Sequence, residues 1–154
     1  MSRKVPWELH KECGPGLLAE FDLQPDPAIR SRAKVLVFKT LGAVRNQVRK
    51  WHSDGFPRGA WAVTLVGPAL KRWHGCNSYD YRALMVFAAT RLSLDVLAHE
   101  CAHSAFAMTE FRDRFDREEG IAIATGNLVQ EADEYLRAGK LYRYSKLPNH
   151  CNAA

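Results

Sequence analysis

The segment from Leu94 to Met108 constrains the fold of this chain more than any other. Ser93 can cap its N-terminus, and the carboxylate of Asp95 in the first turn complements the helix dipole. Apolar residues recur at helical spacing and form one packing face: Leu94, Leu97, Ala98, Cys101, Ala105 and Met108. The sequence therefore predicts an amphipathic helix, which requires a hydrophobic core on one side.

The rest of the chain supplies the elements of that core. Runs rich in β-branched and aromatic residues predict strands over residues 34–39, 60–66 and 82–88. Apolar residues at helical spacing predict helices over residues 41–51 and from about 117 to 136. This order indicates an α+β fold, in which a short mixed sheet packs against the helix of residues 94–108 and the helix that follows it.

The length of 154 residues suits one domain. Prolines interrupt the beginning of the chain at Pro6, Pro15, Pro25 and Pro27. Residues 1–32 are therefore expected to form an N-terminal arm, with a short helix around residues 16–21. Residues 33–136 then form the domain, and residues 137–154 form a basic C-terminal tail.

Composition narrows the class of protein. A hydrophobic fraction of 47% and a charged fraction of 25% exclude a disordered or fibrous chain. No run of about 18 apolar residues is present, and the N-terminus lacks the apolar core of a signal peptide, so we expect a cytoplasmic protein without a membrane partner. The cysteines have no CxxC spacing and are expected to be reduced thiols outside any metal site: Cys13, Cys76, Cys101 and Cys151.

The helix of residues 94–108 contains the sequence His99-Glu100-Cys101-Ala102-His103. Residues four apart on an α-helix lie about 40° apart around the axis and roughly 6 Å apart along it, so both imidazoles can bind one metal ion. Glu100 projects toward the same side and can act on a metal-bound water without being a ligand itself. The ordinary alternative is two unrelated histidines on an exposed helix face.

A catalytic zinc ion normally has three protein ligands and one open position. The best candidate for the third ligand is Glu119, sixteen positions after His103 and near the start of the next helix, and Glu118 is the alternative. Both carboxylates can also be explained as first-turn residues that a helix dipole favours.

Residues 94–128 resemble the gluzincin branch of the zincin metallopeptidases, in which HExxH is followed by a glutamate ligand on a downstream helix. Glu118-Glu119-Gly120-Ile121-Ala122 is similar to the NEGxA-type segment of the aminopeptidase gluzincins, and this resemblance implies the ligand role for Glu119. In the thermolysin-like pattern an aspartate follows the ligand glutamate by four positions, whereas here that position is Ile123. The order of elements also resembles very small zincin domains of the phage and prophage kind.

The reaction that this resemblance implies is peptide-bond hydrolysis, with Zn²⁺ held by His99, His103 and Glu119 and with Glu100 as the general base. Candidate donors to the carbonyl oxygen are Tyr135, Tyr142, Tyr144 and His150. The substrate is expected to be a protein or peptide that adds a strand to a sheet edge.

The competing hypothesis is a zincin-like protein without protease activity, which acts by binding a protein or nucleic acid. The net charge of +5 favours weak contact with nucleic acid, and the tail alternates basic and aromatic residues: Arg137, Lys140, Tyr142, Arg143, Tyr144 and Lys146. A solubilising chain end explains the same composition.

Overall fold

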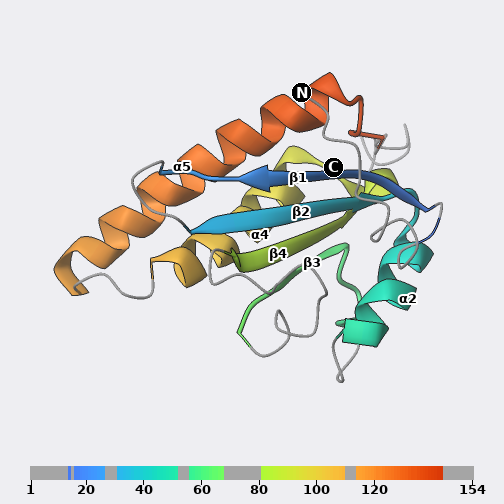
Figure 1. The fold of residues 1–154 in the computed structure, drawn as a ribbon, viewed down its shortest axis with the longest axis horizontal. Coiled ribbons are helices and arrows are strands. Elements are labelled where there is room, and N and C mark those ends of the chain that lie inside the picture. Colours follow the sequence, from blue (N-terminus) through green and yellow to red (C-terminus); the bar gives the residue numbers. More distant parts are fainter. Residues whose placement is uncertain are drawn as a thin grey trace, which may run out of the picture.

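A four-stranded mixed sheet organises the protein (Figure 1). The computed structural model describes residues 14, 16–26, 31–51, 56–67, 81–109 and 114–143. The strands are β1 (Leu17–Leu23), β2 (Arg32–Phe38), β3 (Ala62–Leu65) and β4 (Tyr81–Ala88), in the spatial order β1-β2-β4-β3. The central pair β2 and β4 is parallel, and both outer strands run antiparallel to their neighbours.

Helices cover both faces of the sheet. Helix α2 (Leu41–Trp51) packs on one face, while α4 (Leu94–Met108) and α5 (Arg114–Ala138) pack on the other. A short 3-10 helix, η1 (Ala89–Arg91), joins β4 to α4. Among the described residues, every helix is too short or too polar to span a bilayer.

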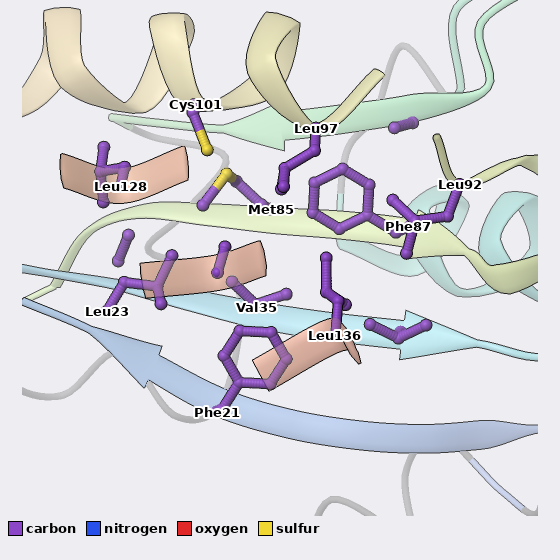
Figure 2. Close-up of a cluster of buried hydrophobic side chains, with 14 of the residues drawn as sticks. Phe21, Leu23, Val35, Met85, Phe87, Leu92, Leu97, Cys101, Leu128 and Leu136 are labelled. Atoms are coloured by element: carbon purple, nitrogen blue, oxygen red, sulfur yellow. The ribbon is translucent and has the colours of Figure 1, made fainter. Parts of the chain in front are cut away.

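The central strands β2 and β4 are largely apolar on both sides because both of their faces are covered, and Lys34 in β2 is a buried charged exception. Every residue from Ala83 to Ala88 in β4 is buried. Figure 2 shows the larger of the two cores, in which side chains of β1, β2 and β4 meet α4 and α5: Phe21, Leu23, Val35, Met85, Phe87, Leu97, Cys101 and Leu128. The smaller core joins the opposite face to α2: Leu36, Phe38, Val44, Val48, Trp51 and Leu84.

Helix α5 lies over the β1 side of the sheet. The rings of Tyr135 and Phe21 stack with their centroids 4.6 Å apart, and the carboxylate of Glu131 accepts hydrogen bonds from the backbone N–H of Gln24. Helix α4 instead contacts β4 and β3. The two helices therefore divide the same face, and α4 lies beside the edge strand β3.

The structure confirms the α+β class and the three strands and three helices that periodicity predicts. The predicted helix around residues 16–21 is wrong, because residues 17–21 belong to β1. Phe21 and Leu23 face the larger core, whereas Asp22 between them faces the other side and pairs with Lys34, which is the period of a strand.

The boundaries of the expected arm and tail also change. Strand β1 lies within residues 1–32 and pairs with β2 along its whole length, so this part of the expected arm belongs to the sheet. At the other end, Leu141 is buried in the larger core and Tyr142 packs against it, so the domain continues past residue 136. Residues 144–154 of the expected tail lie outside the described residues.

Candidate metal centre

His99 and His103 lie together on the exposed side of α4. Their Nε2 atoms are 3.2 Å apart, and the ring planes meet edge-on at 75°. Tetrahedral zinc with Zn–N bonds of about 2.0–2.1 Å requires two ligand nitrogens about 3.3–3.4 Å apart. The spacing of the two imidazoles therefore fits one zinc ion.

Glu100 occupies a different environment from the two histidines. The sequence placed it on their exposed side, whereas its side chain is only 6% exposed and turns toward β3. Its Oε2 accepts a hydrogen bond of 2.5 Å from the hydroxyl of Thr64, and that hydroxyl also lies 3.3 Å from the Glu100 carbonyl oxygen. This correction follows from helix geometry, because successive residues differ by about 100° and Glu100 meets the strand beside α4.

Thr64 is a site residue that the sequence did not reveal. It lies in β3, which pairs only with β4 among the described strands, so the other edge of β3 carries no strand there. Thr64 holds the Glu100 carboxylate at this edge. An isolated threonine 36 positions from Glu100 gives no local signal of that contact.

The predicted packing face of α4 is confirmed in part. Leu97, Cys101 and Ala105 are fully buried, whereas Leu94 is 51% exposed because it is the first residue of the helix. The Cys101 thiol is free and points into the larger core (Figure 2). Burial, and then the charge of Glu100, raise the pKa of this thiol to about 12. Cys101 is a core residue, and the other cysteines lie outside the described residues.

The structure does not bring Glu119 to the histidine pair. Among the described residues, no three His, Cys, Asp or Glu side chains form a group that could hold a metal ion. Glu118 and Glu119 lie in α5, and both side chains are exposed. The third ligand therefore stays a prediction.

The burial pattern of α5 distinguishes the two glutamates. Residues 122, 126 and 130 lie on the same side of α5 as Glu119, and all of them are exposed, so Glu119 lies on the outward face of the helix. Glu118 lies on a flank, next to half-buried Ile121. The opposite flank lines a pocket with the C-terminal end of α4 and the ends of the β1–β2 connection: Gly120, Ile123, Asn127, Met108, Thr109, Pro25 and Ser31.

The tyrosines suggested as donors to a carbonyl oxygen are engaged elsewhere. The ring of Tyr135 stacks on Phe21 in the larger core. The hydroxyl of Tyr142 donates a hydrogen bond of 2.7 Å to Asp133, and burial together with this bond raises the pKa of Tyr142. Tyr144 and His150 lie outside the described residues.

Comparisons of the chain with protein-family models, with curated proteins and with solved structures found no match.

Proposed function

We propose that the protein is a zinc-dependent peptidase that hydrolyses peptide bonds. The observation that carries this proposal is the pair of His99 and His103 nitrogens 3.2 Å apart, together with the buried carboxylate of the adjacent Glu100, which is bonded to β3 at the edge that pairs with no other described strand. A solvated helix face explains two exposed histidines, but it does not explain a carboxylate buried beside them.

Each residue has a chemical role in this proposal. His99 and His103 would hold the ion through Nε2, and zinc, when bound, lowers the pKa of water to about 7. Glu100 takes the proton of the attacking water and later returns it to the leaving amine. Thr64 fixes one oxygen of that carboxylate, which limits the positions that the base can adopt.

The substrate class follows from the edge of β3. An extended peptide can add to an open edge strand through main-chain hydrogen bonds, whatever its side chains. Because Thr64 joins this edge to Glu100, a peptide bound along β3 lies close to the general base. We propose unfolded or extended protein segments as substrates.

The test is the zinc content of the purified full chain together with its hydrolysis of an unfolded protein. We expect one zinc ion per chain, cleavage that a chelator stops and added zinc restores, and loss of both zinc and cleavage in His103→Ala. His103→Ala should retain the fold, because the side chain is exposed. Bound zinc without cleavage would instead support the metal-binding protein that acts through a partner.

The third ligand can be identified with a matched pair of variants. We expect Glu119→Ala to lower zinc affinity more than Glu118→Ala, because the resemblance to the aminopeptidase gluzincins implies the ligand role for Glu119. Competition with a chromogenic zinc chelator measures both affinities. A larger loss in Glu118→Ala would transfer the ligand role to Glu118, and two unchanged affinities would place the third ligand elsewhere in the chain.

The described part of the basic C-terminal segment gives little support to a nucleic-acid function. The Arg137 guanidinium pairs with Asp133 at 2.8 Å, and the Tyr142 hydroxyl donates to the same carboxylate. Both side chains therefore have partners within the protein, which reduces their value for stacking on bases or neutralising phosphates.

A further inference from the structure

An exposed aromatic ring lies next to the histidine pair. Phe106 follows His103 by three positions and His99 by seven, so the three side chains share one side of α4. The Phe106 side chain is 55% exposed, which is unusual for a large apolar residue with no part in either core. It forms an apolar surface beside the proposed zinc site.

A cation from the neighbouring helix lies over this ring. The guanidinium carbon of Arg117 in α5 is 4.4 Å from the centroid of the Phe106 ring, within the range of a cation–π contact. The Arg117 Nε is buried and has no hydrogen-bond partner among the described residues. In contrast, the Arg137 guanidinium, which also lies near a ring, is neutralised by Asp133.

Arg117 lies close enough to the proposed zinc site to contact the same peptide substrate. Three residues of helix rise by about 4.5 Å, so the guanidinium lies on the order of 10 Å from the position that zinc would take. An extended peptide covers this distance with about three residues. Arg117 pairs with no carboxylate in the part of the chain that the structure describes. Such a guanidinium can bind a carboxylate through two parallel hydrogen bonds, and the ring below it fixes its plane.

We propose that Arg117 and Phe106 form a subsite that binds a carboxylate of the peptide substrate, within about three residues of the bond that is cleaved. This inference rests on the proposed peptidase function. The carboxylate belongs either to the C-terminus of the peptide or to an aspartate or glutamate side chain. Arg117 contacts substrate in this role and takes no part in proton transfer.

The experiment measures peptide binding to the full chain carrying Glu100→Gln and loaded with zinc, so that no peptide is cleaved. The probes are one neutral acetylated and amidated hexapeptide, the same peptide with a free C-terminus, and amidated versions with one glutamate at successive positions. We expect one carboxylate peptide to bind about ten- to a hundredfold more tightly than the neutral one. The free C-terminus and the glutamate series distinguish the two sources.

Adding Arg117→Gln should remove this preference and leave the affinity for the neutral peptide and the zinc content unchanged. Arg117→Lys, which keeps the charge but loses the two parallel hydrogen bonds, should retain part of the preference. Arg49→Gln on the exposed side of α2 is the matched control and should keep the full preference. Thermal unfolding checks each variant, and Arg117→Lys decides the result if Arg117→Gln is unfolded.

Three results would overturn the subsite: no carboxylate preference, equal losses for all peptides in Arg117→Gln, or the same loss in Arg49→Gln. Failure of the peptidase function gives a different pattern. A carboxylate preference that depends on Arg117, in a protein whose zinc-loaded native form cleaves no peptide, would refute the proposed function and retain the subsite. Cleavage without any carboxylate preference would support the peptidase function and refute the subsite.

Discussion

Glu100→Gln is expected to keep its zinc ion and lose about 10²- to 10⁴-fold in the rate of peptide hydrolysis, because the amide cannot take a proton from water. Glutamine has the same shape, and its carbonyl oxygen can still accept the hydrogen bond from Thr64. The fold and the histidine pair should therefore be unchanged. The measurements are kcat on an unfolded protein substrate and zinc per chain by elemental analysis.

The control for this variant is Glu134→Gln, which changes an exposed carboxylate on α5. Its rate should equal that of the native chain. Undiminished hydrolysis by Glu100→Gln would remove Glu100 as the general base, even if zinc binding were confirmed. Loss of zinc in Glu100→Gln would show that this carboxylate belongs to the metal ligands.

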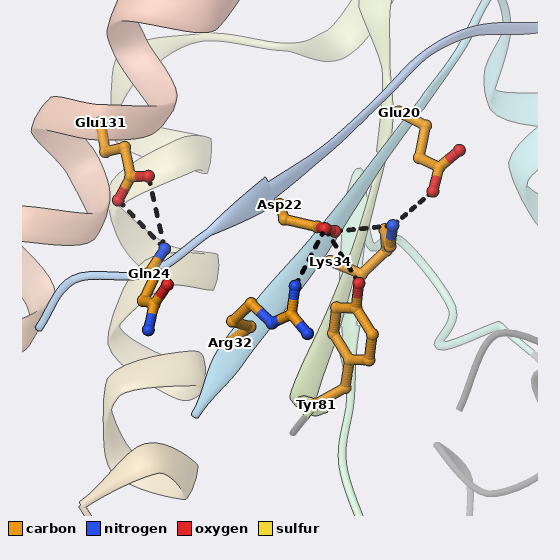
Figure 3. Close-up of polar contacts among 7 residues, drawn as sticks. All are labelled: Glu20, Asp22, Gln24, Arg32, Lys34, Tyr81 and Glu131. Atoms are coloured by element: carbon orange, nitrogen blue, oxygen red, sulfur yellow. Dashed lines mark hydrogen bonds and ion pairs between the residues drawn. The ribbon is translucent and has the colours of Figure 1, made fainter. Parts of the chain in front are cut away.

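Lys34→Met is expected to cost about 3–5 kcal/mol in the free energy of unfolding, because it leaves the buried carboxylate of Glu20 without its cation and leaves Asp22 with Arg32 at 3.8 Å in place of the closer Lys34. Figure 3 shows the Lys34 ammonium between the carboxylates of Glu20 and Asp22, and Lys34 and Glu20 are each 7% exposed. Asp22 lies opposite Lys34 in the register of β1 and β2 and also accepts a hydrogen bond from Tyr81. Urea denaturation measures the loss.

The control is Lys50→Met at the exposed end of α2, which should change the free energy of unfolding by no more than about 0.5 kcal/mol. Equal effects of the two substitutions would show that the buried ion cluster adds nothing to stability. Lys34→Met should leave the zinc content unchanged, because the ion cluster lies on the opposite face of the sheet from α4.

The effect of Lys34 should also depend on pH. Burial alone lowers the pKa of Lys34, but hydrogen bonds to Asp22 and Glu20 outweigh it and raise the pKa above the ordinary value of 10.5. A group whose pKa is raised by folding contributes its full stabilisation below the unfolded value and loses it as the pH rises through the folded value. The difference between the native chain and Lys34→Met should be constant from pH 7 to about 10 and decrease above 10.5.

Local patterns were sufficient for most of the fold but not for β1. The helix of α4 and the central strands follow from the spacing of apolar residues along the chain. In β1 the adjacent Leu17 and Leu18 break the alternation where the register with β2 shifts. Glu20 is a buried charge within this segment, and its partner Lys34 lies on the neighbouring strand, 14 positions along the chain.

The candidate site also contains one part that the sequence predicts and one part that it does not. The positions of His99 and His103 follow from a spacing of four residues on a helix. The burial of Glu100 and its bond to Thr64 depend on where β3 packs, and the contact between Arg117 and Phe106 depends on how α5 returns beside α4. These contacts join residues distant in sequence, so no local sequence pattern predicts them.

The short strand β3 gives the proposed base a weak anchor. With four residues and a single described neighbour, β3 is the shortest of the described strands, so it should open locally at a lower free energy than the sheet as a whole. Each opening releases the Thr64 hydroxyl from Glu100 while the histidines stay in place on α4. The protein would thus alternate between a fully assembled centre and one that can hold metal but has a misaligned base. Amide hydrogen exchange in β3 would measure this opening, and a peptide paired along β3 would favour the assembled form.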